Sequence, residues 1–175
     1  QLYRGGLVLG IGPDIALAGT ELEGYVTCSV SPCRAFGFDG EAKIKARGTG
    51  KEITWTYSDA ASQRPQGIRV VQRSFDGQNG RDYVLYGFRI TNEGAAAVTF
   101  TPGVFLDFDV SPEFLSNLAY SELNGHLAVT TNSDETLHFG SVIVGGPAVP
   151  ANYFFNADVL ISESDVIAAL RGEIS

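Results

Sequence analysis

The stretch from Ile68 to Val110 shows the clearest alternation of apolar and polar positions in the chain. It contains three apolar runs separated by two compact turns, Asp76–Gly80 and Asn92–Gly94. A period of two is typical of strands with one buried face, and short glycine-containing turns join antiparallel strands. This stretch therefore predicts a three-stranded antiparallel meander. The middle run directs one apolar set to a single face, namely Val84, Tyr86, Phe88 and Ile90.

Shorter apolar runs on both sides of this stretch predict further strands, including a hairpin across Asn124–Gly125. One helix is expected near the C-terminus, because Ser162 and Asp165 resemble a capping box and Gly172 stands where a helix end is expected. An apolar sheet face must be covered by a second layer. We therefore expect an all-β fold, an antiparallel two-sheet β-sandwich with one short C-terminal helix, formed as a single domain by residues 1–175.

Composition narrows the classes of partner. The 175-residue chain has a net charge of -8 and only twelve basic residues, which are scattered along the sequence. Nucleic acids and anionic membrane surfaces both select clustered Lys and Arg, so neither is an expected partner. No apolar run reaches the length of a membrane-spanning helix, so no membrane insertion is expected. The chain starts at Gln1 and contains no methionine, so we expect a processed product or a fragment of a longer chain.

Four segments together have a familiar pattern: LYRGGLVLG (2–10), GIRVVQR (67–73), DYVLYGFRITN (82–92) and GVFLDFDV (103–110). The chain resembles a β-sandwich domain of secreted bacterial proteins, of the kind found C-terminal to subtilisin-like serine protease domains and in cell-surface proteins. The closing segment ISESDVIAAL (161–170) is similar to the short helix of those domains. The resemblance implies an extracellular or cell-surface location and no catalysis by this chain.

Such domains usually continue into further strands after the helix, whereas this sequence stops at Ser175. A sheet left with an open edge is a template for pairing with another chain. The resemblance therefore implies a protein partner, or self-association, at an open sheet edge.

Cys28 and Cys33 are the two cysteines of the chain, separated by four residues that include Pro32. In the oxidising environment that secretion implies, they are expected to close a tight disulfide loop. Two reduced thiols in a turn are the alternative.

Two acidic residues share one face of the third central run, Asp107 and Asp109, and Glu113 follows them closely. Carboxylate oxygens at this spacing suit Ca²⁺, the one cofactor the sequence suggests. The alternatives are that they bind backbone N–H groups and arginines at the strand end, or that they act as an acid–base pair. No serine lies in a nucleophile elbow such as G-x-S-x-G, so we do not expect an enzyme.

Aromatic side chains offer the other candidate site. Tyr83 and Trp55 could form a platform that stacks on a glycan, and the further candidates are Tyr57, Tyr86 and Tyr120. Core packing or cross-strand pairing is the alternative use of such residues. Taken together, the sequence predicts a non-catalytic structural, assembly or accessory module of a secreted bacterial protein. The alternatives are a carbohydrate-binding module, or a self-assembling surface or filament subunit completed by strands from neighbours.

Overall fold

The computed structural model describes residues 2–11, 15–18, 26–27, 39–47, 50–60, 62, 65–77, 82–108, 110, 118–122, 127–142, 144–145 and 161–173. Most of these residues lie in strands, and a single short helix closes the described part of the chain. The mostly β class predicted from the alternation is confirmed. Within the same ranges, no helix has both the length and the hydropathy that crossing a membrane requires.

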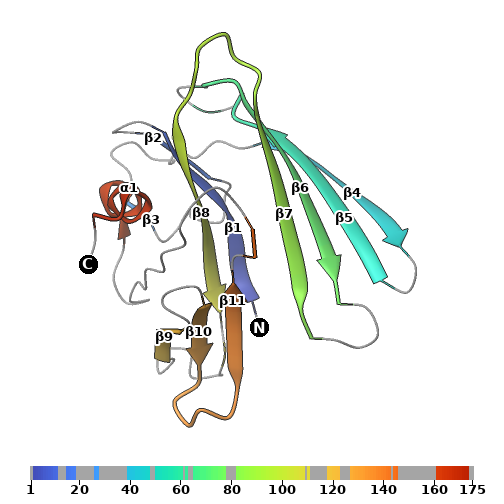
Figure 1. Ribbon diagram of the computed structural model, residues 1–175, viewed down its shortest axis with the longest axis vertical. Coiled ribbons are helices and arrows are strands. Elements are labelled where there is room, and N and C mark those ends of the chain that lie inside the picture. The colour runs from blue at the N-terminus through green and yellow to red at the C-terminus, as the bar shows by residue number, and fades with distance from the viewer. Residues whose placement is uncertain are drawn as a thin grey trace.

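The strands form three small antiparallel sheets and one short parallel pair (Figure 1). The first sheet has the order β2–β1–β8 (Ile15–Ala18, Leu2–Ile11, Phe100–Phe108). The second has the order β4–β5–β6–β7 (Asp39–Arg47, Gly50–Ser58, Ile68–Asp76, Val84–Asn92). The third has the order β11–β10–β9 (His138–Val142, Leu127–Thr131, Leu118–Glu122), and β12 (Ile161–Ser162) pairs in parallel with β3 (Val26–Thr27).

The predicted central meander is half right. β6 and β7 pair antiparallel along their whole length, from Ile68 opposite Asn92 to Asp76 opposite Val84. β8, however, leaves this sheet and pairs with β1. The turn after β7 is compact, because Asn92 accepts a hydrogen bond from the Gly94 N–H (2.9 Å) and donates one to the Ala96 carbonyl (2.7 Å). After this turn the chain crosses to the facing sheet instead of returning along β7. The residues of the turn do not indicate which of these two courses the chain takes.

The buried core lies between the β1 and β6 sheets. Leu9 and Val70 are each 0% exposed, and Ile68 is 1% exposed. Leu7 and Ile11 join them, and partly buried side chains from both sheets and from the β7–β8 connection pack against this cluster: Tyr57, Phe88, Ile90, Val98 and Phe100. The two sheets approach at the end where β7 crosses to β8 and diverge toward the other end (Figure 1). We call these the closed end and the open end.

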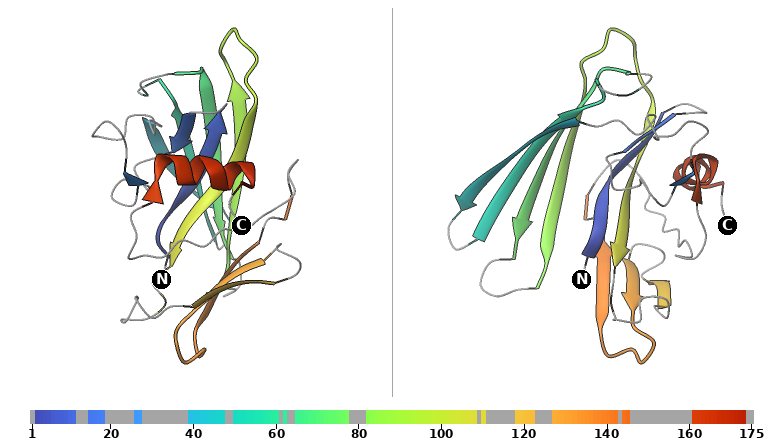
Figure 2. Two further views of the ribbon diagram at one scale, coloured as in Figure 1. Left: turned by 90° about the vertical axis from the view of Figure 1, so that its left-hand side faces the viewer. Right: turned by 180° about the vertical axis from the view of Figure 1, so that it is seen from behind.

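Helix α1 (Glu163–Arg171) covers the face of the β1 sheet that points away from β6 (Figure 2). Two glycines allow this approach: a Cβ at Gly103 would lie 2.5 Å from Leu170 Cδ2, and one at Gly10 would lie 3.0 Å from Leu170 Cδ1. Gly172 ends the helix with φ 72°, as predicted, and its N–H donates to the Ala169 carbonyl (3.0 Å). The molecule thus has a sheet–sheet–helix order at the closed end.

The third sheet continues from the end of β8. The strands predicted on either side of Asn124–Gly125 pair antiparallel as β9–β10, and the turn itself lies outside the described residues. Phe139 of β11 stacks on Phe108 of β8 with ring centroids 5.5 Å apart, and this contact joins the two sheets. The β10–β11 turn is closed by Asn132, whose Oδ1 accepts a hydrogen bond from the Leu137 N–H (2.8 Å).

Candidate functional site

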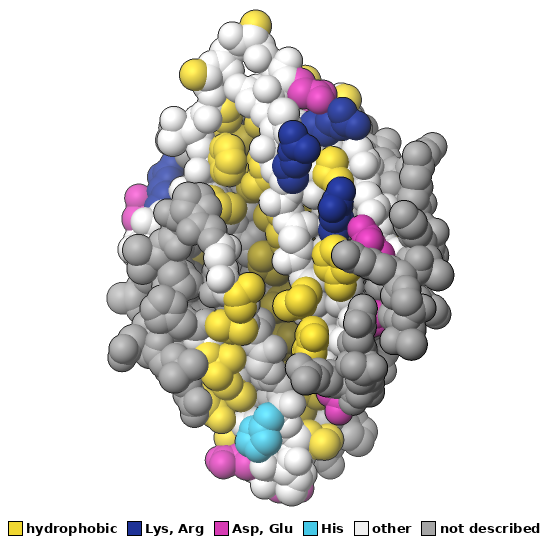
Figure 3. All heavy atoms as spheres, turned by 45° about the vertical axis from the view of Figure 1, so that its right-hand side comes forward, with side chains coloured by type: hydrophobic (Ala, Val, Ile, Leu, Met, Phe, Trp, Pro, Cys, Tyr) yellow, Lys and Arg dark blue, Asp and Glu magenta, His cyan; other side chains and the backbone are white. Residues whose placement is uncertain are grey.

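The open end exposes large apolar side chains that a closed core would bury. Val84 and Tyr86 of β7 are 50% and 46% exposed, and Trp55 of β5 is 41% exposed. The strand register places them on the same face as the buried Val70, because paired residues of antiparallel strands share a face. Figure 3 shows this region as rows of apolar side chains with further apolar atoms deeper between them. We define the open face as Ile53, Trp55, Val84 and Tyr86.

A line of polar side chains runs down β6 through this apolar face. Gln72 lies between Trp55 of β5 and Phe88 of β7, and the next position on that face is Ser74, beside Tyr86. The Tyr57 hydroxyl donates to Gln72 Oε1 (3.2 Å), and Gln72 Nε2 donates to Ser74 Oγ (3.4 Å). Aromatic rings beside an orienting amide and hydroxyl are the usual elements of a binding site for a neutral polar ligand.

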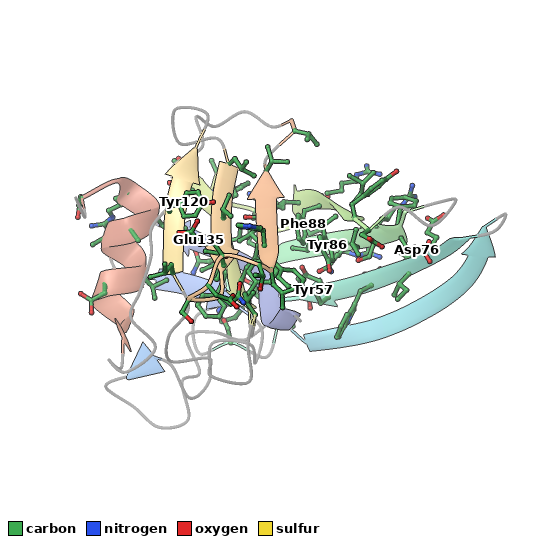
Figure 4. The ribbon with its side chains drawn as sticks, turned by 90° about the horizontal axis from the view of Figure 1, so that it is seen from below. Tyr57, Asp76, Tyr86, Phe88, Tyr120 and Glu135 are labelled. Atoms are coloured by element: carbon green, nitrogen blue, oxygen red, sulfur yellow. The ribbon has the colours of Figure 1, made fainter. Side chains whose placement is uncertain are left out.

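The aromatic side chains of this face are close to one another. The ring centroids of Trp55 and Tyr57 are 6.4 Å apart and their planes meet at 87°, an edge-to-face contact. Seen from below, Tyr57, Tyr86 and Phe88 lie between the four-stranded sheet and the rest of the molecule (Figure 4). The open face therefore presents aromatic surface to anything that enters between the two sheets.

The opposite face of the same sheet is charged. Arg69 and Glu93 form an ion pair at 3.1 Å, and Arg73 Nε lies 4.0 Å from Glu52 Oε1. Arg69, Arg73, Glu93 and Arg89 are all exposed. The Arg69–Glu93 pair is exposed on both sides and contributes about 0–1 kcal/mol, whereas the Glu52 side chain is only 15% exposed. The exposed arginines make this face the solvent side of the sheet.

Hydrogen bonds to Asp59 and Gly67 close the loops at the closed end of the four-stranded sheet. Asp59 is 1% exposed, and its carboxylate accepts hydrogen bonds from the N–H groups of Gln66 (2.5 Å) and Ile68 (2.9 Å). These bonds close the loop between β5 and β6. Gly67, with φ 78°, lies against Gly94, and its carbonyl accepts a hydrogen bond from the Glu93 N–H (2.7 Å). The β5–β6 loop and the β7–β8 loop thus meet at the closed end of the β6–β7 pair.

The structure separates the two residues proposed as a glycan platform. Trp55 lies on the open face. Tyr83 precedes β7 and is two residues from Leu85, so it belongs to the set of positions that point to the charged face. Both side chains are exposed, but they do not form one surface. Tyr57 lies beside Trp55, and Tyr86 lies on the same face two strands away, on β7.

The other predicted site residues are outside the described part. The side chain of Asp107 and the whole of Asp109 and Glu113 lie outside it, as do Cys28 and Cys33, so the calcium site and the disulfide stay predictions. Within the described residues, no group of three or more His, Cys, Asp or Glu side chains is arranged to hold a metal ion. Sequence reasoning missed Gln72 and Ser74, whose only signal was their spacing of two, in phase with Ile68 and Val70.

Comparison with protein-family models, with curated proteins and with solved structures found no match in any of the three. The open face itself is therefore the starting point for a functional assignment.

Proposed function

We propose that this chain is a non-catalytic extracellular module of a secreted bacterial protein, acting in structure or assembly. In this proposal the β1 and β6 sheets are the two layers of a β-sandwich that is filled at one end and receives a partner at the other. The observation that carries it is the open face, where side chains on the core side of a sheet are about half exposed. Apolar surface gathered in one place marks interaction sites in proteins.

The character of the strands supports a protein partner. Val84 and Tyr86 are exposed on β7, the edge strand of one sheet. Val104, which pairs with Leu7 of β1, is exposed on β8, the edge strand of the neighbouring sheet. A partner polypeptide that enters there gains both apolar contact and main-chain hydrogen bonds. The resemblance to domains of secreted proteins is consistent with such an accessory role.

The accessibility of the open face can be measured with 8-anilinonaphthalene-1-sulfonate, a dye that binds exposed apolar surface. Trp55 is the single tryptophan of the chain, so energy transfer from it reports dye bound at this face. We expect transfer in the folded protein, and a marked loss in Tyr86→Ser. Tyr120→Ser is the matched control, because Tyr120 is also partly exposed but lies in the third sheet. A folded protein with no energy transfer contradicts the proposal.

The polar line on β6 favours a second candidate, a carbohydrate-binding module. Trp55 and Tyr86 would stack on sugar rings, while Gln72 and Ser74 would hydrogen-bond to hydroxyls. The probe is a titration of Trp55 fluorescence with cellohexaose and chitohexaose. A saturable blue shift that Gln72→Leu and Tyr86→Ala abolish and Tyr83→Ala preserves supports this candidate, and an unchanged spectrum with both sugars removes it.

A further inference from the structure

Strand β7 forms an unprotected edge of the four-stranded sheet. It pairs with β6 on one side, and within the described residues no strand pairs with its other side. Val84 and Tyr86 are exposed on one face and Leu85 (48%) on the other, while Arg89 is the only charged residue among its nine. Edge strands are normally short, charged, interrupted by proline or covered, because a free apolar edge pairs with other chains. β7 has one charge and no proline, and no described strand covers its free edge.

A glycine near the middle of this edge has no packing contact among the described residues. Gly87 does not have the positive φ seen at Gly67 and Gly172, and nothing lies within 4 Å of a Cβ built on it. Glycine inside a strand costs about 0.5–1 kcal/mol relative to alanine and often marks the close approach of another backbone. A Cβ at Gly87 would project from the charged face into open space.

The side chains on either side of Gly87 are self-complementary. Reading outward, Tyr86 and Phe88 are both aromatic, and Val84 and Ile90 are both β-branched. Between them, Leu85 stands at the position equivalent to Arg89. An antiparallel pairing of two β7 strands centred on Gly87 places Tyr86 opposite Phe88 and Val84 opposite Ile90, which are favourable cross-strand pairs. The same register places Arg89 opposite Leu85 and therefore away from its own counterpart.

We propose that the partner of this edge is a second copy of the chain, joined β7 to β7 across a two-fold axis at Gly87. The dimer then contains a continuous sheet with four strands from each copy. Each copy covers the exposed Val84 and Tyr86 of the other, as an isologous interface requires. This inference rests on the proposed assembly function, and it names the partner and the register.

The first test is the mass of the protein in solution by sedimentation equilibrium across a range of concentrations. We expect a reversible dimer whose dissociation constant rises at least tenfold in Val84→Lys, because a lysine blocks edge pairing. Val142→Lys is the matched control, since Val142 is 53% exposed and lies on the edge strand of the third sheet. A protein that stays monomeric, or a dimer that both variants weaken equally, overturns the proposal.

The second test addresses the register. Leu85→Glu introduces a carboxylate opposite Arg89 of the second copy and is expected to keep or strengthen the dimer. Leu85→Lys, similar in size, opposes two positive charges and is expected to dissociate it. Equal effects of the two variants contradict the register at Gly87. Dye binding at Trp55 separates the two proposals. A monomeric protein that still binds the dye contradicts the dimer but supports the open face as an interaction site. The partner of the β7 edge is then an extended segment of another protein.

Discussion

The two ends of the β6–β7 pair differ in burial although one alternation runs through both. At the closed end, Ile68 and Val70 are fully covered by β1, and Ile90 is half-buried. At the open end, Val84 and Tyr86 belong to the same apolar stripe and are about half exposed. The difference comes from the facing layer, which meets one end of the sheet and diverges from the other (Figure 1). A stripe of this kind therefore identifies a face and leaves open whether that face is covered.

The largest expected effect of breaking the closed end is that of Leu9→Ala. Leu9 is 0% exposed and lies in the core between the two sheets. Truncating a buried leucine costs about 2–5 kcal/mol because a cavity remains. We expect a loss of about 4 kcal/mol in the free energy of unfolding, measured by urea denaturation. Val84→Ala at the open end is expected to cost less than about 1 kcal/mol, and equal losses would falsify the distinction between the two ends.

Asp59, whose carboxylate closes the β5–β6 loop, is expected to have the next largest effect on the free energy of unfolding. Asp59→Ala leaves the N–H groups of Gln66 and Ile68 without their acceptor in a buried site. Losing charged hydrogen bonds and stranding donors costs about 3 kcal/mol. Urea denaturation of Asp82→Ala provides the control, because Asp82 is exposed. A change below about 0.5 kcal/mol in Asp59→Ala would show that the loop is held by something else.

Gly67→Ala should have an intermediate effect. A Cβ at this position would lie 2.6 Å from the Gly94 nitrogen, and φ 78° is a conformation that L side chains rarely adopt. The left-handed conformation alone costs about 1–2 kcal/mol. We expect a lower melting temperature and faster hydrogen exchange at the amides of Ile68 and Glu93. Unchanged protection of these amides would mean that the Gly67–Gly94 contact is not needed.

The smallest expected effect has the opposite sign. Gly87→Ala adds a Cβ into open space in the middle of β7, so it should stabilise the monomer by about 0.5–1 kcal/mol. The same change is expected to leave the dimer intact, because a strand side chain projects out of the sheet plane and two opposed alanines fit an antiparallel pair. Thermal unfolding at low concentration measures the first effect and sedimentation equilibrium the second. A dimer that this change abolishes contradicts a pairing centred on Gly87.

Much of the local structure could be predicted from the sequence. The β6–β7 hairpin follows from alternation on both sides of a glycine-containing turn, and the end of α1 follows from Gly172. The candidate site was only partly predictable. Trp55 and Tyr86 were both named as aromatic candidates, but their place on one face depends on Gln72 and Ser74 of β6, which pair with both flanking strands. Such neighbours are distant in sequence, so no local pattern indicates them.

The sequence by itself determined which residues are extended and which side chains share a strand face, because the two-residue period is a property of the backbone. Tertiary structure alone decided that β8 joins β1 and not β7, since pairing partners are selected by long-range contacts. It also decided which part of the apolar stripe is buried. Burial depends on the distance to the opposite layer, and that distance is set by how the two sheets meet at Leu9, Ile68 and Val70.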